Sequence, residues 1–375
     1  MSRDRLLGSA AIAIVLFVMS LAWSQEQQIK TLEIGAKAPD FDLPGVDGRK
    51  YKLADFAQAD ILVVIFTCNH CPTAQAYEDR IKKLTADYKN KGVAVVAISP
   101  NDPQAVRLDE LGYTDISDSL EQMKIRAKDK TFNFPYLYDG DTQKVTRAYG
   151  AVATPHVFIF DRQRRLRYVG RFDDSERHKQ VKSHDARNAI DALLTGKRIP
   201  VEKTRPFGCS IKWASKRESV TEAFKRWAKE KVSVEMIDAD GVRKIVKNDS
   251  ERLRLVNIWA TWCPACVVEF EELVTIHRMY RRRDFELITI GADLPRKKDD
   301  VLSFLQKRQA SCKNYLFNSE DTYQLVEAVG KESFEGIPYT LLIKPGGEVI
   351  YRHLGLFDPL ELKKAIVEYL GRTYR

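Results

Sequence analysis

Two Cys-x-x-Cys pairs constrain this chain more than any other feature of its sequence. The pairs are Cys68/Cys71 and Cys263/Cys266, 195 residues apart. Each follows a continuous apolar, β-branched run, Ile61–Phe66 or Leu253–Trp259, which is typical of a strand buried on both faces. A disulfide within Cys-x-x-Cys closes a very small loop and adds little stability by loop closure. Such a pair is therefore better suited to thiol exchange than to stapling a fold.

The order of elements around the two pairs is the same, which indicates two copies of one plan. A helical pattern follows each pair, and we expect its apolar face to hold Tyr77, Ile81, Leu84 and Tyr88 in the first copy and Phe270, Leu273, Ile276 and Tyr280 in the second. Further on, each copy has an X-Pro step, a strand hairpin and a last helix. These segments are Thr154-Pro155, 156–160, 166–170 and 185–194 in the first copy, and Ile337-Pro338, 339–343, 349–351 and 358–370 in the second.

The domain boundaries follow from this duplication. A length of 375 residues accommodates two domains, and 44% hydrophobic residues allow each to form a core. We place the first domain at 31–213, a linker at 214–231 and the second domain at 232–375. Phe224 and Trp227 indicate that the charged linker contains a connecting helix.

The N-terminal residues 1–24 predict a secretory signal peptide. Arg3 and Arg5 precede an uncharged stretch of 18 residues, and Ala22-Trp23-Ser24 places small residues where a signal peptidase reads. An uncleaved membrane anchor is the alternative, because this length is the lower edge of a membrane span. Either reading puts the rest of the chain outside the cytoplasm, in the periplasm or secreted.

Both halves resemble the thioredoxin-like superfamily. Residues 31–213 resemble the AhpC/TSA-type redoxins through Gly35–Phe41, the Cys-Asn-His-Cys-Pro motif, Thr154-Pro155 and Phe207–Trp213. Residues 232–375 resemble the exported TlpA/ResA thiol-disulfide oxidoreductases through Trp259–Cys266 and Gly336-Ile337-Pro338, with Glu271 where that family usually has a helix-kinking proline. The resemblance implies an α/β fold class, with two tandem thioredoxin-like folds, each a central mixed β-sheet flanked by helices.

The cysteines are assigned catalytic roles from the chemistry of thiols. A nucleophilic thiol must be a thiolate, and a helix N-terminus favours that charge. We predict that Cys68 and Cys263 start their helices and attack, and that Cys71 and Cys266 resolve the mixed disulfide one turn later. We also expect His70 to stabilise the Cys68 thiolate and to make the first disulfide more oxidising.

The family resemblance adds a substrate-binding face. It implies a cis peptide before Pro155 and before Pro338, so that Thr154-Pro155 and Ile337-Pro338 face the cysteines and bind an extended substrate. It also implies that Trp262, directly before Cys263, shapes this face.

These observations together predict an exported enzyme that exchanges disulfides with protein substrates. The dithiols themselves are the redox groups, so we expect no metal and no other cofactor. An upstream reductant is the implied partner, and a C-terminal pair of lower potential would pass electrons to the N-terminal pair. Membrane contact is expected only if the N-terminal segment is uncleaved. Export disfavours nucleic-acid binding, and we read Arg281–Arg283 as a solvated helix end.

Several alternatives stay open at this point. A thiol peroxidase with a fused reductase domain is the strongest, although Val63 or Val64 replaces the proline of the peroxiredoxin Pro-x-x-x-Thr-x-x-Cys pattern. Two metal-binding readings, half a zinc site and a copper carrier of the Sco type, are weaker, because neither pair has the ligand spacing of a metal site. An inert scaffold is a further weak alternative. The sequence does not assign the two remaining cysteines, Cys209 and Cys312. They could be inert thiols or form an interdomain disulfide, and Cys209 could be a third redox thiol.

Overall fold

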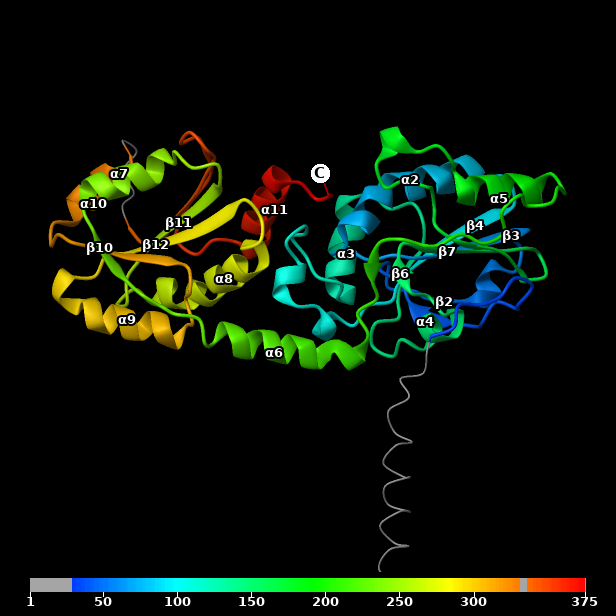
Figure 1. Cartoon of the computed structure of the whole chain (residues 1–375), viewed down its shortest axis with the longest axis horizontal. Helices are drawn as coiled ribbons and strands as arrows, with labels where there is room; N and C mark the ends of the chain where they lie inside the picture. The colour runs from blue at the N-terminus through cyan, green and yellow to red at the C-terminus, as the bar shows by residue number, and fades with distance from the viewer. Residues whose placement is uncertain (1–28, 331–335, 375) are drawn as a thin grey trace, which may run out of the picture.

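The computed structural model describes residues 29–330 and 336–374, and it divides into two α/β units joined by one helix (Figure 1). The predicted signal segment 1–24 lies outside the described residues. Among those described, no helix is both long enough and apolar enough to cross a membrane.

The first unit is built around the apolar run predicted as a central strand. Ile61–Phe66 forms β3, and all of its residues are buried. The five-stranded sheet has the order β5-β4-β3-β7-β8, in which β3, β4 and β5 are parallel and β7 and β8 are antiparallel to their neighbours. The elements of this unit are β1 (Asp42–Pro44), β2 (Lys50–Lys52), β3 (Ile61–Phe66), α2 (Pro72–Tyr88), β4 (Val93–Ser99), α3 (Leu120–Asp129), β5 (Tyr136–Tyr138), α4 (Lys144–Tyr149), β6 (Ala153–Thr154), β7 (His156–Phe160), β8 (Leu166–Gly170), α5 (Asp185–Leu194) and β9 (Cys209–Ser210).

The second unit repeats this plan with one more strand at the edge. Its sheet has the order β10-β13-β12-β11-β14-β15, with the fully buried β11 in the place of β3. Strands β10 to β13 run parallel, and β14 and β15 are antiparallel. The elements are β10 (Glu235–Ile237), α7 (Ala239–Lys247), β11 (Leu253–Trp259), α8 (Pro264–Tyr280), β12 (Phe285–Gly291), α9 (Lys298–Lys307), β13 (Lys313–Phe317), α10 (Thr322–Val329), β14 (Tyr339–Ile343), β15 (Val349–Leu354) and α11 (Pro359–Leu370). The predicted fold class, two tandem thioredoxin-like folds, is confirmed.

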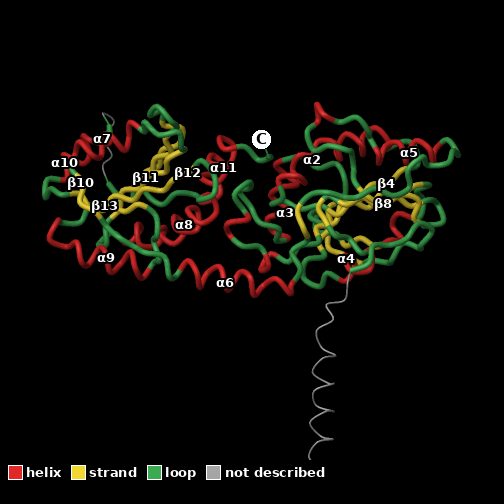
Figure 2. The backbone as a smooth tube through the Cα atoms, viewed as in Figure 1, coloured by secondary structure: helices red, strands yellow, loops and turns green. Residues whose placement is uncertain are grey.

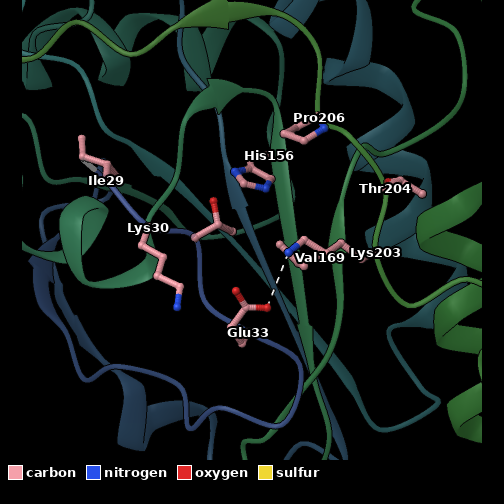
Figure 3. Close-up of a pocket in the computed structure, with 9 residues that line it drawn as sticks. Ile29, Lys30, Glu33, His156, Val169, Lys203, Thr204 and Pro206 are labelled. Carbon is pink, nitrogen blue, oxygen red and sulfur yellow. Dashed lines mark ion pairs between the residues drawn. The ribbon is translucent and has the colours of Figure 1, made fainter.

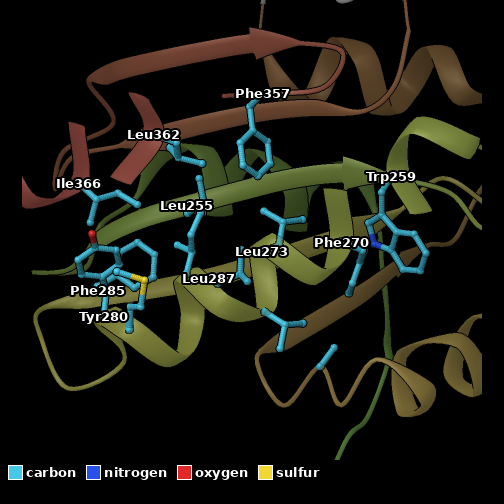
Figure 4. Close-up of a cluster of buried hydrophobic side chains, with 14 of the residues drawn as sticks. Leu255, Trp259, Phe270, Leu273, Tyr280, Phe285, Leu287, Phe357, Leu362 and Ile366 are labelled. Atoms are coloured by element: carbon cyan, nitrogen blue, oxygen red, sulfur yellow. The ribbon is translucent and has the colours of Figure 1, made fainter. Parts of the chain in front are cut away.

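Each sheet buries apolar side chains on both faces, because helices cover both. On α2 and α8 the buried residues include all eight that the helical periodicity predicted. In the second unit one face packs β11 and β12 side chains against α8 and α11 (Figure 4). Trp259 and Phe270 close one end of this core, with their ring centroids 4.6 Å apart, and Tyr280 and Phe285 close the other at 5.6 Å.

Helix α6 (Arg217–Trp227) runs between the two units (Figure 2). The two units also pack against each other directly. The predicted linker helix therefore exists, and Trp227 is buried. A segment of the first unit, residues 103–118, contacts the second unit, and its Val106 and Leu111 belong to the core cluster around α8. We call residues 103–118 the bridging segment.

Polar contacts reinforce this interface. The Tyr280 hydroxyl donates to the Thr114 carbonyl oxygen at 2.8 Å, and Arg372 forms hydrogen bonds of 2.6 and 3.0 Å to the two carboxylate oxygens of Asp115. Arg283 donates to the Gly112 carbonyl oxygen at 2.6 Å, and Arg282 pairs with Asp109 at 2.7 Å. The prediction that Arg281–Arg283 is only a solvated helix end is therefore wrong, because the domain interface needs donors for its carbonyls and carboxylates.

Candidate active site

The first cysteine motif does not begin its helix where the sequence predicted. Helix α2 starts at Pro72, and its N-cap is Cys71, whose Sγ accepts the Ala74 backbone N–H at 3.4 Å. The prediction that Cys68 starts the helix is wrong, because a loop of five residues, 67–71, separates β3 from α2. In the second unit Cys263 is the N-cap as predicted, and its Sγ accepts the Cys266 N–H at 3.2 Å.

Strand register gives the equivalence of the two motifs. Phe66 pairs with His156, the residue after Pro155, and Ile258 pairs with Tyr339, the residue after Pro338. Equivalent positions in these segments therefore differ by 258 − 66 = 192. Cys71 corresponds to Cys263, Cys68 to Ala260 and Ala74 to Cys266. The two Cys-x-x-Cys motifs are thus displaced by one helical turn relative to the fold.

Both X-Pro steps face their cysteines. The peptides Thr154-Pro155 and Ile337-Pro338 are cis, as the resemblance implied. Cys68 Sγ lies 3.3 Å from the Thr154 hydroxyl oxygen, and Cys71 Sγ lies 3.4 Å from the Thr154 carbonyl oxygen. In the second unit Cys263 Sγ lies 3.6 Å from the Ile337 carbonyl oxygen. The substrate-binding role of these residues stays a prediction.

The first site favours a thiolate on Cys71. Burial alone would raise the pKa of this thiol, but hydrogen bonds from Cys209 and Cys68, with the positive charge of His70, hold the pKa well below its usual range. For Cys68, burial together with Cys71 and the charge of Asp118 raises the pKa instead. The stabilising effect of His70 thus acts on Cys71, which differs from the expectation that it would act on Cys68.

His70 is held by a buried carboxylate. Its Nδ1 lies 2.5 Å from Asp118 Oδ2, and both side chains are buried. Burial would lower the pKa of His70, but the charge and hydrogen bond of Asp118 outweigh this and raise the pKa. Asp118 is the last residue of the bridging segment, and it also accepts hydrogen bonds from the Asn69 and His70 N–H groups and from Asn101 Nδ2.

Among the described residues, one group of side chains has the spacing of metal ligands, and it includes His70 and Asp118. Cys68, His70 and Asp118 offer ligand atoms that all lie within 4.8 Å of one another. Each carboxylate oxygen of Asp118 already accepts two hydrogen bonds from protein donors. Asp118 is therefore better suited to orienting His70 than to binding a cation.

The second site has an exposed aromatic side chain beside its disulfide. Cys263 and Cys266 form a disulfide, and Trp262 beside them is 66% exposed. Cys68 and Cys71 are free thiols in this structure, and both are buried. Cys263 and Cys266 are buried as well, so the two sites differ in this neighbouring ring and not in the exposure of their sulfurs.

Glu269 is a buried acid that the sequence analysis missed. It lies on α8 three residues after Cys266, and burial raises the pKa of its carboxyl to about 7. Asn257 Nδ2 donates to Glu269 Oε1 at 2.8 Å, whereas Oε2 has no hydrogen-bond partner. An acidic residue on the apolar side of a helix, one turn after a cysteine, was the signal that would have found it.

Cys209 and Cys312 lie in different units. Cys209 packs against Cys68, Cys71 and Ala74, whereas Cys312 packs on the core of the second unit, with its Sγ 3.3 Å from Asn314 Oδ1. Both are free thiols, so this structure contains no interdomain disulfide between them.

The two cysteine pairs are far apart. Cys263 is at the N-terminal end of α8, and Met279, near its other end, lines a pocket of about 270 Å³ together with His70 and Cys209. A helix of 17 residues spans about 25 Å at 1.5 Å per residue. Thiol–disulfide exchange needs contact between sulfurs, so this arrangement does not allow direct exchange between the pairs.

A larger hollow of about 530 Å³ lies elsewhere on the first unit and contains no cysteine (Figure 3). Lys203 pairs with Glu33 in it at 3.5 Å, and the ring of His156 faces it. Burial lowers the pKa of His156 to about 3, so this histidine is neutral near pH 7.

Comparison with known proteins was made for both units. The AhpC/TSA family matches residues 34–169, and the Redoxin family matches residues 226–367. The thiol-disulfide oxidoreductase ResA of Bacillus cereus is 24% identical over 169 residues, which are 43% of this chain and 85% of that protein. A Mycobacterium tuberculosis protein provisionally named a peroxiredoxin is 27% identical over 139 residues, 33% of this chain and 88% of that protein.

Solved structures are similar to parts of the chain as well. The crystal structure of a hypothetical protein from Sinorhizobium meliloti has 38% sequence identity and a TM-score of 0.45, and the match covers 50% of this chain and 97% of that one.

Proposed function

The chain belongs to the thioredoxin-like redoxins, as an AhpC/TSA domain followed by a redoxin domain, and we propose that it exchanges disulfides with protein substrates outside the cytoplasm through Cys263 and Cys266. The observation that carries this proposal is the surface around the second disulfide. Cys263 caps a helix N-terminus, an exposed Trp262 stands beside it, and the cis Ile337-Pro338 peptide faces its sulfur.

The reaction begins from the reduced pair. The Cys263 thiolate, stabilised by the helix N-terminus, attacks one sulfur of a substrate disulfide and releases the other as a thiolate. Cys266 then loses its proton and attacks the Cys263 sulfur. This step releases the reduced substrate and forms the Cys263–Cys266 disulfide, so two electrons pass to the substrate. An upstream dithiol reductant restores the pair.

Glu269 supplies a place for the proton of Cys266. With its pKa near 7, its carboxyl can take up and return a proton near neutral pH. Cys266 is buried and Glu269 lies one helical turn after it, so in this proposal the Glu269 carboxylate accepts the proton of Cys266 as the second step begins. The carboxylate oxygen of Glu269 without a hydrogen-bond partner is the acceptor in this proposal.

Trapping of mixed disulfides tests the proposal. A Cys266→Ser variant of the secreted form is expected to hold substrate proteins on Cys263, because the resolving thiol is missing. Cys312→Ser is the matched control, since it removes a half-buried thiol of the same domain. Equal trapping by both variants would contradict the assignment of Cys263 as the attacking residue.

The distance between the two cysteine pairs restricts any transfer of electrons from the second pair to the first. In this arrangement the first site faces the C-terminal end of α8, so a relay from Cys263–Cys266 requires the domains to separate. A shared soluble reductant that serves each pair independently needs no such movement.

A thiol peroxidase activity of the first domain is the second candidate. The favouring observation is that Cys71 is the N-cap and the favoured thiolate, which makes it the sulfur suited to attack a peroxide. Counting from Cys71, Cys68 stands at the threonine of the peroxiredoxin pattern and Val64 at its proline. Hydrogen peroxide consumption that is lost in Cys71→Ser and kept in Cys263→Ser would establish this activity.

A further inference from the structure

Cys209 is brought to the first site by a short strand pairing. Strand β9 pairs with β6 in antiparallel fashion, and Cys209 stands opposite Thr154, the residue whose carbonyl oxygen faces Cys71. The preceding Gly208 has φ 138°, and a Cβ there would lie 2.1 Å from the Thr154 carbonyl oxygen. Only glycine allows this close approach. The glycine therefore lets β9 pair with β6, and this pairing places Cys209 next to the cis peptide.

The three sulfurs of the first domain form one cluster with Cys71 at its centre. Cys68, Cys71 and Cys209 pack together around Ala74. Cys68 and Cys209 both help to hold the pKa of the Cys71 thiol well below its usual range, against the effect of burial. Ala74 stands where the second domain has its resolving Cys266, so a partner for Cys71 has to come from outside the helix.

The three sulfurs differ in their access to solvent. Cys68 is 2% exposed and Cys71 is fully buried. Cys209 is half-buried, and it lines both the pocket of about 270 Å³ at the domain interface and a wider one of about 570 Å³ that Tyr374 also lines. Cys209 is therefore the sulfur of the cluster that an external thiol or disulfide reaches first.

We propose that Cys209 is a third redox cysteine, which exchanges with the Cys68–Cys71 disulfide and carries it to the surface as a Cys71–Cys209 disulfide. This inference rests on the proposed exchange with protein disulfides, extended to the first site: a substrate disulfide oxidises Cys68 and Cys71 to their disulfide and is itself reduced to two thiols. In the step, the Cys209 thiolate attacks the Cys71 sulfur, the Cys71–Cys209 bond forms and the Cys68–Cys71 bond breaks. The electron pair of the broken bond stays on Cys68, which takes up the proton that Cys209 lost. No net oxidation occurs, so the step needs no further reagent.

The contact between Cys209 and the Cys71 thiolate makes the step depend on the redox state of the site. While Cys71 is a thiolate, Cys209 donates to it, and its own pKa is raised. Once Cys71 is in a disulfide, this negative charge is gone and Cys209 loses the main cause of its raised pKa. Cys209 is thus held protonated when the site is reduced and becomes a better nucleophile when the site is oxidised.

Disulfide mapping of the full chain tests the proposal. Wild-type, Cys68→Ser, Cys209→Ser and Cys312→Ser proteins are oxidised with diamide and digested without reductant, and linked peptides are quantified by mass spectrometry. We expect both Cys68–Cys71 and Cys71–Cys209 links in the wild type and in Cys312→Ser. We expect only Cys71–Cys209 in Cys68→Ser, at least about tenfold above any link to Cys312, and only Cys68–Cys71 in Cys209→Ser.

Two results would overturn the inference. One is a Cys68→Ser protein in which Cys71 and Cys209 stay unlinked. If that variant does not fold, absence of the Cys71–Cys209 peptide from both the oxidised wild type and Cys68→Ala has the same force. Reduction of insulin by the second site is measured on the same samples. Its presence without the link defeats this inference alone, whereas the link without insulin reduction defeats the proposed function alone.

Discussion

The two domains contain the same motif at different places in the same fold. In the second domain the first cysteine caps the helix and the second lies one turn inside it, whereas in the first domain the second cysteine is the cap. Equivalent positions in the two domains differ by 192 in residue number. At these positions the second domain has Ala260, Trp262 and Glu269, and the first domain has Cys68, His70 and Tyr77. An exposed aromatic ring and a buried acid are thus replaced by a buried imidazole and a phenol. Motif spacing alone therefore does not determine which cysteine caps the helix, and a helix N-terminus favours a thiolate on the capping sulfur.

The largest expected effect separates Cys263 and Cys71, the two sulfurs proposed to attack. Cys263→Ser is expected to reduce insulin reduction to the uncatalysed background, because no thiolate remains at that helix N-terminus. Cys71→Ser is expected to leave insulin reduction unchanged, since the two sites are not in contact. The measurement is turbidity of insulin with dithiothreitol as electron source. A comparable loss in Cys71→Ser would show that the domains act as one relay.

The buried acid of the second domain predicts a pH effect on stability. Between pH 4.5, the usual pKa of glutamate, and about 7, the folded protein keeps a proton on Glu269 that the unfolded chain releases. The free energy of unfolding therefore falls as pH rises through this window. Glu269→Gln removes this loss, so near pH 8 the variant is expected to be more stable by roughly 2 to 3 kcal/mol.

Urea unfolding of the oxidised protein on both sides of this window measures the effect. Tyr77→Phe is the matched control, because Tyr77 occupies the equivalent position and its buried hydroxyl has no hydrogen-bond partner. We expect no pH-dependent difference for this control. An equal slope of stability against pH in Glu269→Gln and wild type would contradict the raised pKa of Glu269.

The contacts between the domains predict that Cys71 is alkylated faster when the domains separate. Arg372→Ala removes two hydrogen bonds to Asp115, and a hydrogen bond to a charged group contributes about 1.5 to 3 kcal/mol. Alkylation of Cys71 in the reduced protein is expected to accelerate about tenfold or more as the domains separate. Arg296→Ala, which breaks an exposed pair with Glu320, is the control. Unchanged labelling of Cys71 would mean that the interface does not limit access.

The smallest expected effect concerns the exposed ring of the second site. Trp262→Ala is expected to lower kcat/KM for a protein substrate about fivefold, which corresponds to the roughly 1 kcal/mol of an aromatic contact. Reduction of a small aromatic disulfide should change little, because it does not span the surface. Val268→Ala removes an equally exposed apolar side chain of α8 and is the control. The same loss for both substrates would assign Trp262 to the disulfide itself rather than to the substrate face.

Much of the fold was predictable because its central elements are strongly patterned. The runs Ile61–Phe66 and Leu253–Trp259 coincide with β3 and β11, and the last helix of the first domain begins and ends as predicted. Apolar periodicity determines such elements locally. The interface contacts of Arg282 and Arg283 and the position of Cys209 depend instead on contacts between residues far apart in the chain, which no local pattern encodes.

The helix start of the first domain could have been predicted from a local sequence pattern other than the Cys-x-x-Cys motif. Both Cys71 and Cys263 are followed directly by proline, and proline is favoured at the first position of a helix. Aligning the two Cys-Pro steps, rather than the two Cys-x-x-Cys motifs, identifies Cys71 as the cap. Glu269 could be recognised in the same way, as an acid among apolar positions of the following helix.

The bridging segment links domain contact to the charge around Cys71. Its residues Val106 and Leu111 lie in the core of the second domain, Asp115 binds Arg372, and Asp118 holds His70. A change in one of these contacts therefore alters the free energy of the others. By thermodynamic reciprocity, if docking of the domains shifts the redox equilibrium of the first site by some factor, oxidation of that site shifts the docking equilibrium by the same factor. A measurement of the distance between the two domains would then report the redox state of the first domain.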